Sequence, residues 1–458
     1  MTRKVKITYL DHFWMQLETD PFTNSFIRKF FTVFKPGSQF SQSFKAGNWS
    51  GTILFFTGTN RLPIGLLQEL INICNKNEVV IEYSNHRFTL QPAIYPVNEN
   101  LLPQITLRGY QVEAINKCLE QGLGIIKIAT GGGKTSIITG VLKAYQPKMA
   151  LVVANQINLV MQTRDRMIKY GFPEDEIGII YGGEKDFENK RYVISTIQSI
   201  LQYPEVYKRA EVLLIDEVKH QQAASYVDLI KRCPAVVRIG FDATPFTYDD
   251  QVIDWTIKKC IGDVIYEKST KELIDMKLLV RPIIGMIKIH NDSVYKGLDY
   301  RTAYKDLIVT NADRNNMIRK IVEKENGRIL VLIREIEHGR QLMHLIKNAI
   351  FLHGEIDSME RYNEIQNFIN SEDKFVLIGS TIFDEGIDFE KGIDAIIIAS
   401  AGKGFRKVVQ RLGRALRPNK KGYVSVYDFY DEGNKHLEKH SKARFNIYKN
   451  EQHSVSLI

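Results

Sequence analysis

Three consecutive glycines, a lysine and a threonine lie between two apolar runs in the stretch IKIATGGGKTSIITG, residues 126–140. Gly131, Gly132 and Gly133 let the backbone turn tightly and present its N–H groups, which can hold phosphate oxygens together with the positive end of a following helix. Lys134 would reach the β- and γ-phosphates, and the Thr135 hydroxyl would bind Mg²⁺. The strict pattern has glycine at position 128, where this chain has isoleucine. The strand–turn–helix context predicts a phosphate-binding loop.

Two adjacent carboxylates follow an apolar run about eighty residues later, in EVLLIDEVKH. Asp216 at the end of a strand suits contact with Mg²⁺, and Glu217 suits polarising an attacking water. Alone, such a pair reads better as a helix N-cap. Behind a phosphate loop at this spacing, the catalytic interpretation is favoured.

Short apolar runs alternate with helix-length spacers around these residues, which is typical of a parallel sheet buried on both faces. The same rhythm returns after about residue 280, so we predict two consecutive α/β lobes. The expected strands of the first lobe are GIIKIAT, MALVVAN, RYVISTI, EVLLIDE and VVRIGFDAT, and those of the second are GRILVLI, NAIFLHG, KFVLIGST, DAIIIAS and YVSVYDF.

Residues 1–95 read as a small α+β domain ahead of these lobes. An alternating opening strand precedes a helix-like stretch over 20–34, a strand over 52–56 and an amphipathic helix over 64–75. The proline-containing stretch 90–107 is the predicted linker. We therefore expect domains at 1–95, 96–275 and 276–458. The basic tail from Asn434 to His453 is either a solvated helix or a binding arm.

The composition sets weaker limits. The net charge of +9 from 62 Lys+Arg and 53 Asp+Glu is compatible with a polyanionic partner but does not require one. The four cysteines are far apart, which disfavours zinc and disulfide frameworks and predicts buried reduced thiols. The N-terminus has no signal-type apolar core and no run approaches a membrane span, so we expect a soluble intracellular protein.

These motifs resemble those of superfamily 2 helicases and translocases of the DExH type, which implies two tandem RecA-like lobes that use ATP and Mg²⁺. ATGGGKT, including Thr130, resembles motif I, LLIDEVKH motif II and FDATP motif III. ISTIQSI is similar to motif Ib, which implies nucleic-acid contact by Thr196 and Gln198. LRGYQ resembles the adenine-recognition segment, which implies that Arg108 and Gln111 lie near the base. Stacking of the adenine on Tyr110 is an open alternative that the resemblance does not require.

In the second lobe, VVQRLGRALRP resembles motif VI, in which Arg411, Arg414 and Arg417 recur every three residues beside Gln410. The resemblance implies that Arg414 and Arg417 reach the γ-phosphate and neutralise charge in the transition state. STIFDEGIDF is similar to motif V, which implies Ser380 and Thr381 near nucleic-acid phosphate and Gly386 and Asp388 near nucleotide. FLHGEIDSMER resembles the segment that places His353 and Gly354 in the nucleic-acid groove.

Motif II departs from the family pattern at its fourth residue. The usual histidine is replaced by Lys219, with His220 one position later. In the family this histidine couples the nucleotide site to the interface between the lobes. The substitution by Lys219 therefore changes the residue on which this coupling depends. The assignment of Glu217 is unaffected.

The N-terminal stretch FKAGNWSG…FFTGTNRLPIGLL resembles the first domain of phage UvsW-type branch-migration helicases, such as those of T5-like phages. The resemblance implies that Lys45, Trp49 and Arg61 contact phosphate and a base or fork junction; Trp49 alternatively packs in the core. We expect a monomeric DNA helicase, moving 3′→5′ in an infected host's cytoplasm, that remodels branched DNA or RNA–DNA hybrids. An RNA helicase, a duplex translocase without strand separation and a nucleotide-gated DNA clamp are the alternatives.

Overall fold

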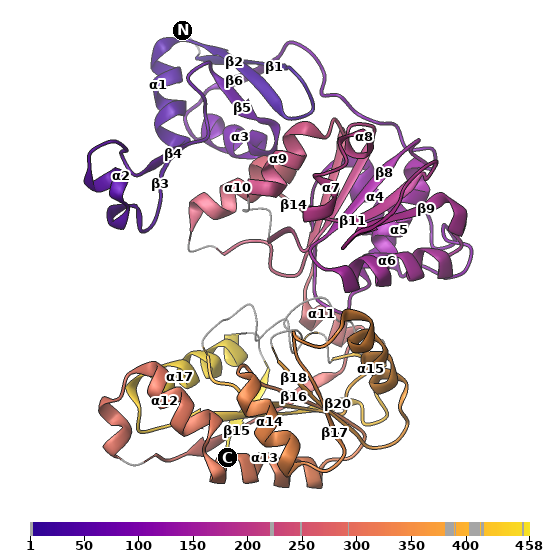
Figure 1. Cartoon of the computed structure of the whole chain (residues 1–458). Helices are drawn as coiled ribbons and strands as arrows, with labels where there is room; N and C mark the ends of the chain where they lie inside the picture. Colours follow the sequence, from indigo (N-terminus) through magenta and orange to yellow (C-terminus); the bar gives the residue numbers. More distant parts are fainter. Residues whose placement is uncertain are drawn as a thin grey trace. The chain divides into compact units, whose positions relative to one another are not determined.

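The computed structural model describes residues 3–219, 224–247, 250–291, 293–380, 389, 391–402, 413, 416–450 and 453–458. The chain divides into two compact units: residues 1–128 with 133–268, and residues 269–458, to which the loop residues 129–132 are assigned. Each unit carries a predominantly parallel sheet, and a small α+β module precedes the first (Figure 1). The predicted α/β class with two RecA-like lobes behind a small N-terminal domain is confirmed.

The N-terminal module is a sheet of order β5-β2-β1-β6, covered by helices α1 and α3. In β1 every second side chain is buried, as in Val5 and Ile7, so the alternating pattern predicts this strand correctly. Its elements are β1 (Lys4–Tyr9), β2 (Trp14–Thr19), α1 (Pro21–Phe30), β3 (Thr32–Phe34), α2 (Gln42–Lys45), β4 (Thr52–Leu54), β5 (Arg61–Pro63), α3 (Leu67–Lys76) and β6 (Val80–Tyr83).

The helix expected over 20–34 ends earlier than predicted. Asp20 caps its start by accepting from the backbone N–H groups of Phe22 and Thr23. The helix stops at Phe30, and the β-branched Thr32 and Val33 instead pair with β4 in an antiparallel hairpin. We call residues 32–54 the β3–β4 arm; it projects to one side of the module in Figure 1.

The module and the first lobe share a core. Trp255 of α10 (Gln251–Ile261) packs its ring against Phe31 and Phe55 of the module, with centroids 5.3 and 5.4 Å away. At Gly65 a Cβ would lie 2.0 Å from the Lys258 carbonyl oxygen, so only glycine permits this approach. Deleting the module would therefore expose apolar surface of the first lobe. The predicted linker, residues 90–107, contains no helix or strand, and all its residues are described.

The first lobe is built on a sheet of order β10-β9-β11-β8-β12-β13-β7-β14, in which only β10 runs antiparallel to its neighbour. All residues of β8 and β13 are buried, as expected for central strands covered on both faces. The elements are α4 (Gly109–Gln121), β7 (Leu123–Ile128), α5 (Lys134–Tyr145), β8 (Ala150–Ala154), α6 (Ile157–Lys169), β9 (Ile177–Tyr181), β10 (Glu184–Asp186), β11 (Tyr192–Thr196), α7 (Ile197–Ile200), α8 (Pro204–Tyr207), β12 (Val212–Asp216), α9 (Ala224–Arg232), β13 (Val237–Asp242), α10 and β14 (Val264–Lys268).

The second lobe has a sheet of order β17-β18-β16-β19-β20-β15-β21, in which each strand runs parallel to its neighbours. The five strands predicted for each lobe are present, whereas β9, β10, β14, β15 and β21 were not predicted. The elements are α11 (Thr270–Asp275), β15 (Arg281–Ile289), α12 (Tyr300–Tyr304), α13 (Ala312–Lys324), β16 (Arg328–Leu332), α14 (Ile336–Leu345), β17 (Ala349–Leu352), α15 (Ser358–Asn370), β18 (Phe375–Gly379), β19 (Ala395–Ile398), β20 (Tyr423–Asp431), α17 (Lys435–Asn450) and β21 (Ser454–Leu457).

The basic tail is neither a solvated helix nor a free arm, which corrects the sequence-based expectation. Its helix α17 buries Leu437, Ile447 and Tyr448 within the second lobe. Arg444 of the same helix is only 1% exposed and binds Asp428 of β20. The helix is thus a structural layer of the lobe.

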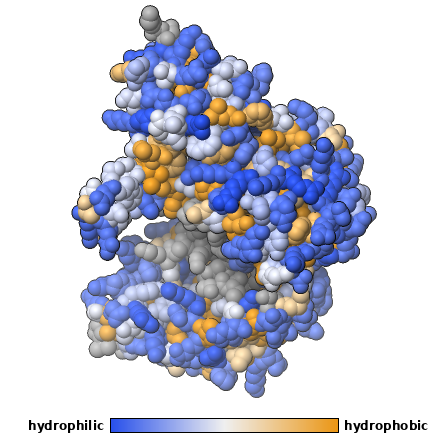
Figure 2. All heavy atoms as spheres, turned by 45° about the horizontal axis from the view of Figure 1, so that its top comes forward, coloured by the Kyte–Doolittle hydropathy of each residue, from blue (hydrophilic) through white to orange (hydrophobic). Residues whose placement is uncertain are grey.

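All four cysteines are buried and unpaired, as predicted, and burial raises the pKa of the Cys74, Cys233 and Cys260 thiols to about 11. The face drawn in Figure 2 is mostly hydrophilic, with small apolar patches. Within the described ranges, no helix has the length and apolar character needed to span a bilayer.

Candidate functional site

The predicted phosphate loop lies between a buried strand and a helix. Strand β7 ends at Ile128, and α5 begins at Lys134. Gly131 and Gly133 have φ of +87° and +79°, which disfavours any residue with a Cβ. A Cβ on Gly133 would also lie 2.4 Å from Gln111 Nε2. The N-terminal end of α5 therefore follows a glycine turn, the geometry that binds phosphate.

Lys134 faces the two predicted carboxylates. Its Nζ lies 3.8 Å from Asp216 Oδ1 and 3.6 Å from Glu217 Oε1. Asp216 ends β12, and Glu217 follows in a left-handed conformation with φ of +56°. The structure thus brings Lys134 close to two adjacent residues that lie more than 80 positions later in the sequence.

A third carboxylate, Asp242, completes this group and was not singled out from the sequence. It ends β13 with no exposed surface and accepts from the backbone N–H groups of Lys219, at 2.9 Å, and Thr244, at 2.8 Å. The signal was present: FDATP comes at the end of the predicted strand VVRIGFDAT, and this strand, β13, pairs directly with β12. Burial raises the pKa of Asp242, and the nearby Glu217 raises it further.

Negative charge is only partly neutralised in this cluster. Burial raises the pKa of Asp216 to about 6; Lys134 opposes the shift, whereas Glu217 and Asp242 add to it. A divalent cation beside Asp216 would reverse this balance by stabilising its ionised form.

The oxygen donors of this cluster fit Mg²⁺. Asp216 and the Thr135 hydroxyl are hard oxygen donors, as this ion requires when it also binds nucleotide phosphates. The Thr135 Oγ accepts a hydrogen bond from Arg166 Nη1 at 3.0 Å, which leaves the hydroxyl a second lone pair. Among the described residues, no group of three or more His, Cys, Asp or Glu side chains could hold a metal by itself. Protein and phosphate oxygens would share the ion.

The adenine-recognition segment lies at the start of α4. Arg108 is the N-cap residue and is exposed, while Gln111 is 4% exposed and its Oε1 accepts from the Arg108 backbone N–H. Tyr110 is buried, and its hydroxyl binds Arg108 Nη1 at 3.2 Å. The buried Tyr110 ring is therefore not accessible for stacking on adenine in this conformation. Gln111 has its Nε2 toward Gly133, beside the phosphate loop.

The predicted nucleic-acid residues of the first lobe differ in access. Thr196 ends β11, is 6% exposed and binds Ser199 Oγ at 3.0 Å. Gln198, on α7, is exposed. Of the two side chains predicted from motif Ib, Gln198 is thus the one accessible from solvent.

In the second lobe, two of the predicted segments meet at one sheet edge. His353 and Gly354 follow β17, and Ser380 follows its parallel neighbour β18, with the Ser380 N–H donating to Leu352 O at 3.2 Å. Arg417 is half-buried, and its carbonyl lies against Gly392, where a Cβ would be 2.2 Å away. The predicted residues Thr381, Gly386, Asp388, Gln410 and Arg414 lie outside the described residues.

In the N-terminal module, the predicted contact residues fall on two elements. Lys45 ends α2 of the β3–β4 arm and is exposed; Trp49 is half-buried, with Nε1 donating to Thr52 O at 2.9 Å. Arg61 is exposed at the start of β5, in the main sheet. Sequence reasoning missed the exposed Phe34 and Phe40 of the arm, because an exposed phenylalanine and a core phenylalanine look alike in a sequence.

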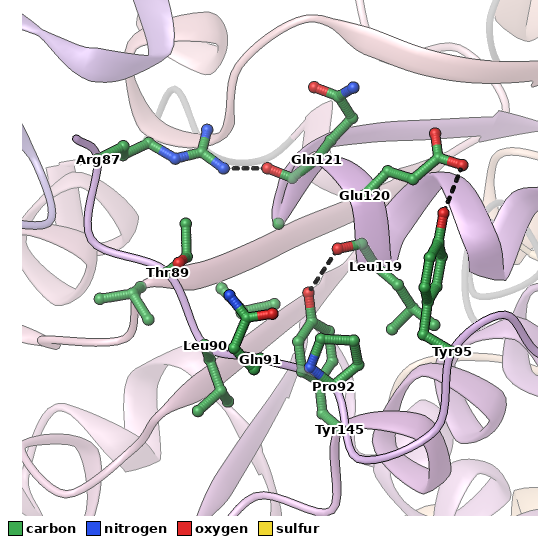
Figure 3. A pocket seen from close by; sticks show the side chains of 13 residues that line it. Arg87, Thr89, Leu90, Gln91, Pro92, Tyr95, Leu119, Glu120, Gln121 and Tyr145 are labelled. Atoms are coloured by element: carbon green, nitrogen blue, oxygen red, sulfur yellow. Dashed lines mark hydrogen bonds between the residues drawn. The ribbon is translucent and has the colours of Figure 1, made fainter.

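A separate cavity of about 320 Å³ lies between the linker and the C-terminal end of α4 (Figure 3). Tyr95 donates to Glu120 Oε1 at 3.2 Å there, and Tyr145 donates to Cys118 O at 3.3 Å. The cavity includes Gly122, which precedes β7, whereas the phosphate loop follows β7. The six residues of β7 separate the two places by about 20 Å, so this cavity is not part of the nucleotide site.

Three family models match consecutive parts of the chain. Residues 4–83 match the N-terminal domain of the DNA helicase UvsW, residues 104–247 the type III restriction enzyme res subunit, and residues 313–419 the helicase conserved C-terminal domain. The first match ends with strand β6, and the second begins at residue 104, five residues before α4.

Similar whole proteins include the "DNA 3'-5' translocase XPB2" of Sulfurisphaera tokodaii, 26% identical over 367 residues, which covers 69% of this chain and 80% of the relative. The fragment structure of a putative HsdR subunit of a type I restriction enzyme from Vibrio vulnificus aligns with TM-score 0.58 and 17% identity, covering 77% of this chain and 68% of that one. The crystal structure of T4 UvsW aligns over 99% of both chains, with 19% identity and a TM-score of 0.49.

The fold, the Lys134–Asp216–Glu217 cluster and the order of the three family matches agree with one another. The chain is a superfamily 2 helicase that resembles UvsW.

Proposed function

We propose that this protein is an ATP-driven, 3′→5′ DNA motor that remodels branched DNA, by branch migration, fork regression or unwinding of D-loops and R-loops. The observation that carries the motor part is the placement of Lys134 within 4 Å of both Asp216 and Glu217 behind a glycine turn. In this role Lys134 binds the β/γ-phosphates, Thr135 and Asp216 hold Mg²⁺, and Glu217 orients the attacking water.

ATP hydrolysis by this site would draw on residues of both lobes. Thr130 and the glycines bind phosphate, and Arg108 and Gln111 lie near adenine. From the second lobe, Gln410, Arg414 and Arg417 would stabilise charge at the γ-phosphate, and Gly386 and Asp388 would contact nucleotide. Movement along a strand would follow from closure of the lobes on ATP and reopening after hydrolysis.

DNA contact would use predicted residues of both lobes, in the second lobe those at the edge of the sheet where β17 and β18 end. Gln198 and Thr196 in the first lobe and His353, Gly354, Ser380 and Thr381 in the second would hold one strand, mainly through phosphates. Such contacts carry little sequence information and suit a motor that must accept any sequence.

Recognition of a branch would reside in the β3–β4 arm. From Pro21 to Gln68 the sequence contains no Asp or Glu. The arm itself carries Lys35 and Lys45, and Arg28, Lys29 and Arg61 flank it in the sequence. Phe34 and Phe40 are 51% and 76% exposed, which is unusual for phenylalanine unless the rings meet a partner. Cations for phosphates and exposed rings for bases are the chemistry that binds unpaired DNA at a junction. The match of residues 4–83 to the N-terminal domain of the DNA helicase UvsW supports a role of this module in a DNA helicase. Branch recognition and a context of phage replication, recombination and repair are part of the proposal.

A second candidate is a duplex DNA translocase without strand separation. The match of residues 104–247 to a restriction-enzyme subunit and the likeness to a relative called a DNA translocase favour it. Both candidates hydrolyse ATP, so strand displacement from a labelled fork separates them.

The first test is ATP hydrolysis with no nucleic acid, single-stranded DNA, linear duplex, a four-way junction or single-stranded RNA, with Lys134→Ala as the blank. Strongest stimulation by the junction is expected. Strongest stimulation by RNA would contradict the proposal in favour of an RNA helicase, and ATP binding without turnover on any polymer would indicate a nucleotide-gated clamp.

The arm is tested by point substitution, because removing residues 1–95 would strip Phe31 and Phe55 from Trp255. Lys45→Ala and Trp49→Ala are expected to lower the preference for the junction over linear duplex while keeping the turnover that single-stranded DNA stimulates. Loss of turnover on every substrate would contradict a role limited to substrate choice.

A further inference from the structure

Lys219 binds the glutamate that is expected to orient the attacking water. Its Nζ lies 2.8 Å from Glu217 Oε2, and the two side chains are only 7% and 9% exposed. The other oxygen of the same carboxylate, Oε1, lies 3.6 Å from Lys134 Nζ. Each oxygen of Glu217 thus faces a different lysine.

The backbone from 216 to 219 is fixed at both ends so that this contact forms. The Glu217 N–H donates to Asp216 Oδ1 at 3.0 Å, and the Lys219 N–H donates to Asp242 Oδ2 at 2.9 Å. Glu217 between them has φ of +56°, a conformation that is unfavourable for a residue with a Cβ. The turn brings the Lys219 side chain back to a carboxylate only two residues earlier.

The two lysines have different tasks once nucleotide is present. Lys134 is expected to turn toward the phosphates, which would leave Glu217 beside the carboxylates of Asp216 and Asp242. Lys219 is held by its backbone contact to β13 and would stay with Glu217 Oε2. A histidine in its place would be largely neutral at pH 7 and would not supply this fixed charge.

We propose that Lys219 is a positioning residue, which holds Glu217 through Oε2 so that Oε1 faces the attacking water. The inference rests on the proposed ATP hydrolysis. As the water oxygen bonds to the γ-phosphorus and the bond to the leaving ADP oxygen breaks, Glu217 Oε1 receives the water proton. Lys219 does not touch water or phosphate in this role. Its charge holds the Glu217 carboxylate in place against repulsion by the neighbouring carboxylates of Asp216 and Asp242.

The experiment compares Lys219→Met, which has similar length without charge, with Lys219→Arg, which keeps the charge. Junction-stimulated kcat is expected to fall by about tenfold or more in Lys219→Met, with KM for ATP changed by less than about threefold. Lys219→Arg is expected to recover at least about a third of the parent kcat. Affinity for a fluorescent ADP analogue, measured in EDTA, is expected to stay within about threefold of the parent for both variants.

Lys258→Met is the control, because Lys258 is a partly buried lysine of the first unit that also forms ion pairs, with Asp263 at 2.7 Å and with Glu69. Its kcat is expected to match the parent even where its melting temperature falls. Should Lys219→Met fail to melt cooperatively, Lys219→Gln takes its place with the same expectations.

An unchanged or higher kcat in Lys219→Met would overturn the proposal, as would a loss of ADP-analogue affinity as large as the loss of kcat. A parent protein that binds ATP but does not hydrolyse it with any polymer would instead overturn the proposed function. The two failures are therefore distinguishable.

Discussion

Each lobe buries a cluster of charged side chains, and the two clusters differ in how closely their opposite charges are paired. In the second lobe, Arg444 donates from Nε and Nη2 to both oxygens of Asp428, at 2.9 and 3.1 Å, and from Nη1 to Gly402 O at 2.8 Å. Asp428 also accepts from the Tyr448 hydroxyl at 2.8 Å. In the first lobe, Lys134 stands 3.6–3.8 Å from its carboxylates, beyond ordinary hydrogen-bond length.

The difference separates a structural charge cluster from one prepared for a ligand. Burial acts to lower the pKa of Arg444, but Asp428 raises it overall, so the guanidinium charge is stable in the interior. Burial instead raises the pKa of Asp216 to about 6, so its negative charge is poorly tolerated there. A bidentate, saturated pair needs no further partner, whereas the first-lobe cluster would gain from a divalent cation with nucleotide.

The largest expected effect is on turnover. Lys134→Ala removes the charge that would stabilise the β/γ-phosphates, so kcat should fall by about a thousandfold, which corresponds to about 4 kcal/mol. A coupled ATPase assay with saturating junction DNA measures it. Lys127→Ala is the control: this lysine lies on the preceding strand and pairs with Glu267 at 2.7 Å. Turnover within about threefold of the parent in Lys134→Ala would exclude the phosphate-loop assignment.

In the second lobe the expected effect is on stability. Asp428→Asn leaves Arg444 buried without a full counter-charge, so the free energy of unfolding should fall by about 3–5 kcal/mol. Urea unfolding followed by circular dichroism measures it. Glu82→Gln, which removes the charge of an exposed partner of Lys4, should cost less than about 1 kcal/mol. Equal losses in the two variants would contradict the structural role of the buried pair.

The same type of substitution should have the opposite sign in the first lobe. The folded-state pKa of Asp216, about 6, lies above the ordinary value of 3.8. Between these values the folded state holds a proton that the unfolded state has lost, so stability falls as the pH rises through this window. In metal-free protein at pH 7.5, Asp216→Asn should therefore stabilise the fold by about 2–3 kcal/mol.

Urea unfolding in EDTA at pH 7.5 and pH 4.5 measures this effect. The stabilisation should shrink toward the lower pH, where Asp216 in the parent is already protonated in the folded state. Destabilisation at both pH values, as expected for Asp428→Asn, would show that the first-lobe cluster is as complete as the second and would remove the distinction between them.

The comparison also shows how far sequence could predict the molecule. Lys134 was identifiable because a glycine-rich loop joins it to the apolar strand β7, and Asp216 and Glu217 because they lie at the end of the apolar strand β12. Parallel strands bring their carboxyl ends to one edge of the sheet. The central strands were found for the same reason. Strand β15 was missed because Pro282 and Gly285 interrupt its apolar run and its side chains are not continuously buried.

Other features depend on contacts that sequence spacing does not encode. The Lys219–Glu217 pair forms in a segment where Glu217 has a positive φ, and the sequence does not show this conformation. Arg444 sits in a tail rich in Lys, Arg and His, so nothing in its neighbours distinguishes a buried arginine from an exposed one. Tyr110 was considered for stacking because only its type, and not its burial, is visible in LRGYQ.

The smallest expected effect concerns the β3–β4 arm, where charge and aromatic rings are exposed rather than buried. Phe40→Ala should weaken binding to a four-way junction by about fivefold, about 1 kcal/mol, because one ring that could stack on a base is lost. Stability should stay within about 0.5 kcal/mol, since the ring is 76% exposed. Phe88→Ala is the control, because Phe88 is 47% exposed but lies outside the arm. Fluorescence anisotropy with labelled junction and labelled duplex measures the affinity of both variants. An equal loss of affinity for the two substrates would make Phe40 a general DNA contact. A loss confined to the junction would place branch recognition on the arm and leave the charge cluster of the first lobe to drive movement.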